Sequence, residues 1–355
     1  MYYNENNIEK AENKAKSDSK SLSDILKAKD TYALTAHMKA GVKEYLNSDT
    51  YKNYLDAVSK FHRYSSKNIC LLLSQNQNIS MVASYKDWKE KFERQVAKGS
   101  KSLKIYVPKI QKLKDDEGKV KLDPNGKEMT RTYFQLGSVF DVSQTTGKEI
   151  PKPVYQLEGE VKNYSNIYAA LTKTTKVEIG FTDISSSVNG FYQPDADIIR
   201  IQKGMKQEQT IKTVIHEIAH SNLHNLEARK KHEYTKEEKE LQAESVAYVV
   251  SNHLGIDTSS YSFGYLANWS SDKNTLDHLE ISMSIIRDEA AKIISRLDQE
   301  LTQVKTKSAA KDSLESDIEK ARLKQQQMEV NSQSKKEQRS LTQDNQEQQK
   351  EQNKK

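Results

Sequence analysis

The residues best suited to chemistry stand together in the run His216-Glu217-Ile218-Ala219-His220, which is an HExxH sequence. Residues four apart lie on one face of a helix, so His216 and His220 can direct their imidazoles at one metal ion. Glu217 lies one position further round the helix, where it can accept a proton from water without being a ligand. Because Zn²⁺ lowers the pKa of bound water to about 7 and polarises carbonyl groups, the run predicts zinc-dependent hydrolysis with Glu217 as the catalytic base.

The third metal ligand is expected on a second helix, predicted over residues 236–253. Glu240 and Glu244 are the candidates, because they lie four residues apart and share a helix face. Apolar residues surround Glu244 in the sequence, and a buried carboxylate is costly unless it is paired or bound to a metal. From the residues alone, either glutamate is eligible as the ligand.

The separation of 20 residues between His220 and Glu240 resembles the arrangement of the thermolysin-like gluzincins. That resemblance implies that Glu240 binds the metal and that Glu244, one turn later, orients a ligand histidine. His224 does not occupy the third-histidine position of the HExxHxxGxxH pattern, and we interpret it as a polar residue at a helix end. Candidate donors to an oxyanion are Tyr248, Tyr261 and Tyr265.

The elements before this site are predicted from periodicity. Residues 32–73 have apolar positions at helical spacing, and alternation over residues 103–107 predicts a strand that ends at Pro108. A polar loop is expected over residues 114–127, and a second strand over residues 133–142. The first half is therefore expected to combine helices with a β-hairpin.

The second half is expected to hold the metal helix in a mixed α and β setting. Helices are predicted at 164–171, 207–222, 236–253 and 275–297, and strands at 176–181 and 198–201. The strand at 198–201 precedes the metal helix, where it is either an edge strand that pairs with substrate or a core strand. Both interpretations fit the sequence.

Composition and charge narrow the class of protein. The chain has 355 residues, of which 35% are hydrophobic and 30% charged, and no apolar stretch reaches the ~20 residues of a membrane span. The N-terminus has no signal-peptide pattern and Cys70 is the single cysteine, so we expect a cytoplasmic protein without membrane insertion. Residues 31–155 carry 22 basic and 13 acidic side chains, whereas residues 156–300 carry 16 and 22, so phosphate backbones are attracted to the first half only.

The basic half interleaves cations with aromatic residues, as proteins that bind single-stranded DNA require. Cations neutralise the backbone and aromatic rings stack on bases, although a helical Trp is more often a core residue. The candidate DNA-binding residues are Arg63, Lys67, Lys86, Trp88, Arg94, Lys98, Lys101 and Lys104.

These motifs resemble a known family. The runs Phe61-His-Arg-Tyr-Ser-Ser-Lys-Asn68, Val82-Ala-Ser-Tyr-Lys-Asp-Trp88 and Val139-Phe-Asp-Val-Ser-Gln-Thr-Thr-Gly147 resemble the N-terminal domain of ArdC-type antirestriction proteins of conjugative plasmids and related mobile elements. The HEIAH run and Glu240-Leu-Gln-Ala-Glu-Ser-Val-Ala-Tyr248 resemble their zincin-like C-terminal domain, which is akin to the ImmA/IrrE peptidases. The resemblance implies a single-stranded DNA-binding domain followed by a zinc metallopeptidase-like domain.

We therefore predict an α+β protein of two domains with disordered termini. The expected divisions are a disordered segment at 1–29, an ArdC-like single-stranded DNA-binding domain at 30–152, a gluzincin-type zincin-like domain at 153–300, and a helical to disordered Lys/Gln-rich tail at 301–355. The resemblance implies a role in conjugative transfer and antirestriction, with an unidentified protein or peptide substrate. The alternatives are a non-catalytic protein that coats DNA and holds a structural or vestigial metal site, and an adaptor in the transfer machinery.

Overall fold

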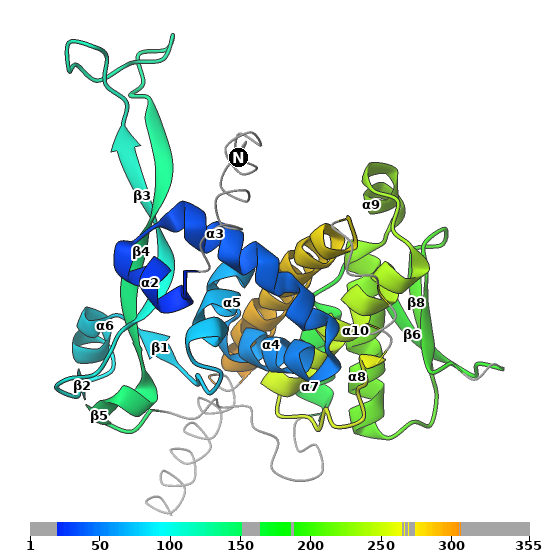
Figure 1. Ribbon diagram of the computed structural model, residues 1–355. Coiled ribbons are helices and arrows are strands. Elements are labelled where there is room, and N and C mark those ends of the chain that lie inside the picture. The colour runs from blue at the N-terminus through cyan, green and yellow to red at the C-terminus, as the bar shows by residue number, and fades with distance from the viewer. Residues whose placement is uncertain are drawn as a thin grey trace, which may run out of the picture. The chain divides into compact units, whose positions relative to one another are not determined.

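The computed structural model describes residues 20–150, 164–185, 188–264, 266, 269, 274–304 and 306. Both helices and strands are present in each half of this part of the chain, so the predicted α+β class is confirmed (Figure 1). Contacts between residues divide the chain into two compact units, and the first ends at Leu297. The residues whose contacts are described below belong to this first unit. Among the described helices, none combines the length and the apolar composition that crossing a bilayer requires.

The N-terminal half begins with helices that pack around one another. They are α2 (Leu22–Ala28), α3 (Thr31–Ala40), the 3₁₀ helix η1 (Gly41–Leu46), α4 (Ser48–Phe61) and α5 (Ser66–Gln75). The short helix α6 (Tyr85–Glu90) follows them and packs against strands instead. A side-chain cap defines the start of each of these α-helices: Ser84, for example, accepts a hydrogen bond from the backbone N–H of Asp87 at 3.0 Å at the start of α6. The expected helical region at 32–73 is confirmed.

The strands of this half form a long hairpin and two short pairings. They are β1 (Val82–Ala83), β2 (Arg94–Val96), β3 (Leu103–Lys112), β4 (Thr130–Asp141) and β5 (Thr145–Gly147), with the 3₁₀ helix η2 (Val142–Gln144) before β5. The sheet order is β1-β4-β3, and β2 pairs with β5. The distal half of the β3–β4 hairpin extends away from the helices (Figure 1).

The second half places helices against one face of a small sheet. Its elements are α7 (Tyr164–Thr172), β6 (Glu178–Thr182), β7 (Gly190–Gln193), β8 (Ile198–Gln202), α8 (Gln207–Leu223), α9 (Leu226–Lys231) and α10 (Lys236–His253), with a last helix from residue 274. The sheet order is β6-β8-β7, with β6 parallel and β7 antiparallel to β8. Ile199 and Ile201 of β8 are fully buried on the face that α8 covers.

The two halves meet where α4 packs against α10. The hydroxyl of Tyr51 lies 2.9 Å from that of Ser245, and the Asp56 carboxylate accepts hydrogen bonds from Tyr248 at 2.8 Å and Asn252 at 2.7 Å. Helix α4 of the N-terminal half therefore packs against and hydrogen-bonds to α10, the helix that carries Glu240 and Glu244. The predicted boundary between residues 152 and 153 lies outside the described residues.

Two expectations need correction. The segment predicted as disordered at 1–29 contains α2, where Ile25 is only 5% exposed and packs in a core with Leu34 and Leu71; residues 1–19 lie outside the described part. The strand expected to end at Pro108 continues to Lys112, with Pro108 opposite Phe134. β3 is an edge strand of its sheet, where the N–H that proline lacks is not needed for a ladder hydrogen bond.

Candidate metal centre

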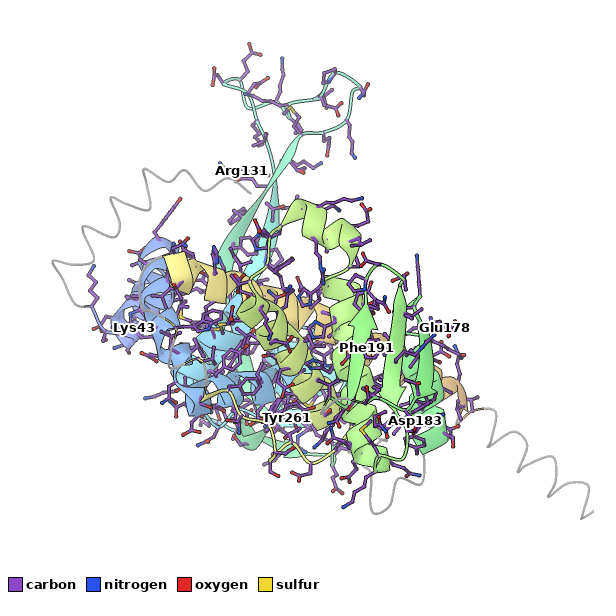
Figure 2. All side chains as sticks on the ribbon, turned by 90° about the vertical axis from the view of Figure 1, so that its right-hand side faces the viewer. Lys43, Arg131, Glu178, Asp183, Phe191 and Tyr261 are labelled. Atoms are coloured by element: carbon purple, nitrogen blue, oxygen red, sulfur yellow. The ribbon has the colours of Figure 1, made fainter. Side chains whose placement is uncertain are left out.

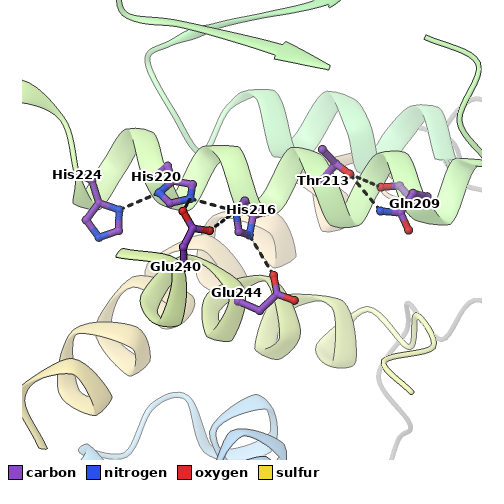
Figure 3. A network of polar contacts seen from close by, with 7 residues as sticks. All are labelled: Gln209, Thr213, His216, His220, His224, Glu240 and Glu244. Atoms are coloured by element: carbon purple, nitrogen blue, oxygen red, sulfur yellow. Dashed lines mark hydrogen bonds and ion pairs between the residues drawn. The ribbon is translucent and has the colours of Figure 1, made fainter. Parts of the chain in front are cut away.

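Helix α8 presents the two histidines of the HExxH run on one face. Its opposite face is apolar, since Ile211, Val214, Ile215 and Ile218 are all fully buried. The Nε2 atoms of His216 and His220 face one another at 3.0 Å (Figure 3). The helical period thus brings both imidazoles to one point, as the sequence predicts.

Helix α10 brings Glu240 to the same point. Its two carboxylate oxygens lie 3.7 Å from the Nε2 of His216 and 3.7 Å from the Nε2 of His220. One ligand atom from each of the three residues lies within 4.8 Å of the others. Two imidazole nitrogens and a carboxylate oxygen are a donor set that suits a divalent transition metal, so these residues fit such an ion.

Glu244 contacts the other side of the His216 ring. Its carboxylate lies 3.2 Å from Nδ1, the nitrogen that points away from the shared point. Burial lowers the pKa of His216, but the hydrogen bond that its ring donates to Glu244 and the negative charges of Glu217, Glu244 and Glu240 outweigh this effect, so the net pKa is raised. Glu240 therefore lies within reach of a point shared with both histidines, whereas Glu244 contacts the far nitrogen of His216. The roles of Glu240 as ligand and Glu244 as orienting residue, which the gluzincin resemblance implies, remain predictions.

The Nδ1 side of the His220 ring, which faces away from the shared point, begins a chain of hydrogen bonds that the sequence did not predict. Its Nδ1 lies 3.0 Å from Nδ1 of His224, the Nε2 of His224 lies 3.1 Å from Oε1 of Gln242, and Gln242 donates to the hydroxyl of Ser282 at 3.0 Å. His224 does lie at the C-terminal end of α8, as the sequence predicts, but it is only 1% exposed and hydrogen-bonded on both ring nitrogens. Burial lowers the pKa of His224 to about 4, which keeps its imidazole neutral at pH 7.

The proton positions along this chain follow from the donor rules. A metal-binding Nε2 of His220 carries no proton, so its Nδ1–H donates to the free Nδ1 of His224. His224 then carries its proton on Nε2 and donates to the carbonyl oxygen of Gln242. Three elements, namely α8, α10 and the helix from residue 274, therefore fix the ring that faces the candidate ion.

We expect that His224→Phe weakens divalent metal binding by about 10- to 100-fold, because the ring of His220 loses its acceptor. Competition with a chromophoric chelator measures the affinity. The matched control is His232→Phe, since His232 is exposed at the end of α9. Unchanged affinity in His224→Phe would show that the chain of hydrogen bonds does not support the ligand.

Glu217 lies beside the shared point and is buried, with 5% of its side chain exposed. Burial raises its pKa, while the neighbouring His216 and His220 and the backbone N–H of Tyr192 in β7 act in the opposite direction. A cleft of about 810 Å³ opens over these residues, lined by β7, α8 and α10. A carboxylate fixed in this position can act as a base toward a water molecule in the cleft.

The strand that borders the cleft is β7, which the sequence did not predict. The strand predicted at 198–201 is β8, the central strand, because β6 and β7 pair with its two sides; the core-strand alternative is the one observed. Gly190, Phe191 and Tyr192 of β7 line the cleft, and Figure 2 shows Phe191 and Tyr261 on this side of the molecule.

Of the three tyrosines considered as oxyanion donors, Tyr261 lines the cleft. Tyr248 donates its hydroxyl to Asp56 instead, and Tyr265 lies outside the described residues. The donor role of Tyr261 remains a prediction.

The DNA-binding residues predicted in the N-terminal half differ in outcome. Trp88 is fully buried, packs with Ala83 and Val96, and donates from Nε1 to the carbonyl of Phe140, so the prediction that it stacks on DNA is wrong. Tyr85, three residues earlier, is 54% exposed and borders a small pocket. The aromatic ring that this segment offers to a partner is therefore Tyr85.

Several of the predicted cations also have protein partners. Arg94 donates to Thr145 and to the carbonyls of Gly147 and Lys148, so its guanidinium holds β5 beside β2. Lys67 pairs with Glu280, Lys86 with Glu90, and Lys104 donates to two serines, Ser102 and Ser138. The exposed cations of the set without such contacts among the described residues are Arg63, Lys98 and Lys101.

Comparison with known proteins identifies the class of the N-terminal half. Residues 26–140 match the family model of the N-terminal domain of anti-restriction factor ArdC, which confirms the resemblance seen in the sequence for this part. The matched segment runs from α2 to the end of β4 and stops before the metal centre.

Individual proteins are similar to this chain over a longer stretch than the family model. An uncharacterized protein of Bacillus anthracis is 26% identical over 282 residues, which cover 70% of this chain and 47% of that protein; the chain thus spans about half of its curated relative. Crystal structures of the antirestriction ArdC protein from plasmid R388 are also similar. The metal-free form is 18% identical with a TM-score of 0.45, covering 68% of this chain and 86% of that one. The Mn(II)-bound form is 17% identical with a TM-score of 0.40, covering 67% and 84%.

Proposed function

We propose that this chain is a metal-dependent peptidase joined to a single-stranded DNA-binding region, and that it acts in antirestriction during the transfer of a mobile element. The observation that carries the enzymatic part is the convergence of His216, His220 and Glu240 on one point with Glu217 buried beside it. The antirestriction part rests on the match of residues 26–140 to the ArdC N-terminal domain.

The residues of the cleft supply the parts of a hydrolytic reaction. A divalent ion held by His216, His220 and Glu240 would activate water and polarise the carbonyl to be cleaved. Glu217 accepts the proton of the attacking water and can later deliver it to the leaving amine. The nearby backbone N–H of Tyr192 favours the ionised form of this carboxylate, which is the form that can accept a proton.

Strand β7 supports a peptide as the substrate. Its pairing with β8 uses one side, and its other side borders the cleft beside Glu217. An extended peptide can add to such an edge by main-chain hydrogen bonds, which would place one of its carbonyls over the metal ligands.

The metal identity follows only in part from the ligands. Imidazoles suit zinc, whereas the carboxylate also binds harder ions such as Mn²⁺. Zinc is therefore the proposed ion, and manganese is the alternative ion to be compared with it in the activity assay.

We expect hydrolysis of a mixture of internally quenched peptides to fall to background after treatment with a chelator. The chelator removes the ion that would activate water but leaves the ligands intact, so activity should return when Zn²⁺ or Mn²⁺ is added back. Fluorescence measures both steps. Activity that persists in metal-free protein would contradict the proposal and favour the alternative, a DNA-coating protein with a structural or vestigial metal site.

Binding of single-stranded DNA is favoured by the charge of the N-terminal half, where exposed cations such as Lys98 and Lys101 accompany exposed rings such as Tyr85. Its signature is an affinity that falls as salt rises, because bound cations displace counterions from the phosphates.

A further inference from the structure

The distal part of the β3–β4 hairpin, residues 107–135, forms an arm with both faces in solvent. β3 and β4 stay in continuous register to the pair Lys112 and Thr130. Beyond Val107 every residue of β3 is exposed, and so is every residue of β4 before Leu136. An isolated two-stranded ribbon buries too little to stabilise a fold, so its side chains are available to a partner.

The two faces of the arm differ in chemistry. Residues paired across antiparallel strands share a face, and the pairs Lys109–Tyr133 and Gln111–Arg131 alternate with the pairs Pro108–Phe134 and Ile110–Thr132. We call the side chains of Lys109, Gln111, Arg131 and Tyr133 the cation face. The opposite face is largely apolar, with Ile110 75% exposed.

The charges on the cation face are not neutralised by carboxylates among the described contacts. Arg131, labelled on the hairpin in Figure 2, donates from Nε and Nη2 to the side-chain oxygen of Gln111 at 3.1 and 2.9 Å, which holds its guanidinium across the ribbon against the opposite strand. Lys112, on the other face, pairs with Glu128 at 2.6 Å. Tyr133 lies directly across from Lys109 and two residues along β4 from Arg131, and it is 44% exposed.

The tip of the arm is built to hold this ribbon in shape. Leu113, Lys121 and Met129 form a closed ring of backbone hydrogen bonds, each donating to the next at 2.8–2.9 Å. Between them, the runs Asp115-Asp-Glu-Gly-Lys119 and Asp123-Pro-Asn-Gly-Lys127 fold alike, because each leading Asp accepts two backbone N–H groups. The carboxylates of Asp115 and Asp123 therefore accept hydrogen bonds within the tip.

We propose that the cation face of the arm binds single-stranded nucleic acid, with a base stacked on Tyr133 and phosphates contacted by Lys109 and Arg131. A ring flanked by cations is what a sequence-independent single-strand site requires, whereas the bases of a duplex offer no free face to stack on. This assignment rests on the proposed DNA-binding function and locates part of it on the arm.

The test compares adjacent residues on opposite faces in the full-length chain. Fluorescence anisotropy with a labelled oligo(dT) of about 20 nucleotides is measured for wild type, Tyr133→Ala, Tyr133→Trp and the double variant Lys109→Ala/Arg131→Ala. The control is Phe134→Ala, the next residue along β4, which is 37% exposed on the other face.

Tyr133→Ala should weaken binding about 10-fold, Tyr133→Trp should restore it, and Phe134→Ala should leave it near the wild-type value. Removing both cations should reduce the salt slope by about 1.4, close to 0.7 for each phosphate that is no longer neutralised. Equal losses in Tyr133→Ala and Phe134→Ala would overturn the assignment to this face.

The failures of the two proposals can be told apart. If wild type binds oligo(dT) with the expected salt dependence but only Lys98→Ala/Lys101→Ala weakens it, the arm is not the site and the DNA-binding function stands. If wild type shows no binding, the DNA-binding function itself fails and the assignment falls with it.

Discussion

Glu217→Gln is expected to lower peptide hydrolysis by about 10²- to 10⁴-fold while the protein still binds its metal. The substitution keeps the size and shape of this buried side chain. It removes only the ability to take a proton from water. The loss should therefore appear in turnover, measured with quenched peptides on metal-loaded protein.

The control for this variant lies on the same helix. Glu208→Gln, in the exposed first turn of α8, should retain wild-type turnover. Hydrolysis that survives in Glu217→Gln would show that Glu217 is not the base. The same variant separates the functional alternatives in cells, because antirestriction that persists without this carboxylate does not depend on catalysis at this site.

The parts of this site that the sequence predicted are those fixed by local geometry. The capping box of Thr235 and Glu238 starts α10 at Lys236, and the helical period then places Glu240 and Glu244 on one face. The same period directs His216 and His220 together on α8. These relations need no knowledge of the rest of the fold.

The parts that were missed depend on contacts between distant segments. His224 is buried because α10 and the helix from residue 274 supply Gln242 and Ser282, neither of which is near it in sequence. β7 is only 4 residues long and becomes a strand by pairing with β8. A short run such as Gly190–Gln193, which ends before Pro194, carries too little periodicity to be recognised alone.

Trp88 and Tyr85 show the same limit for the DNA-binding half. Both lie on the short helix α6 with cations nearby, so composition does not tell which ring is free. The choice is made by Ala83 and Val96, which enclose Trp88, and by the carbonyl of Phe140, which accepts its N–H.

Removing a ligand of the metal centre is expected to reduce its affinity far more than removing the residue that orients a ligand. A structural zinc site with four ligands contributes about 10–16 kcal/mol, so one of three protein ligands is worth several kcal/mol, on the order of 10³-fold in affinity. His216→Ala and Glu240→Gln should each show this loss. Glu244→Gln should cost about 10- to 100-fold, since Glu244 contacts only Nδ1 of His216.

Competition against a chelator measures the metal affinity of each variant, and the metal content of the purified proteins provides a second measurement. The control is Glu237→Gln, in the exposed first turn of α10, which should keep the wild-type affinity. A larger loss for Glu244→Gln than for Glu240→Gln would reverse the roles of the two glutamates, an alternative that the sequence alone left open. Equal, wild-type affinities in His216→Ala and Glu240→Gln would mean that these side chains do not share an ion. In that case the proximity of Nε2 and carboxylate atoms would be a feature of packing, and hydrolysis could not be assigned to this cleft.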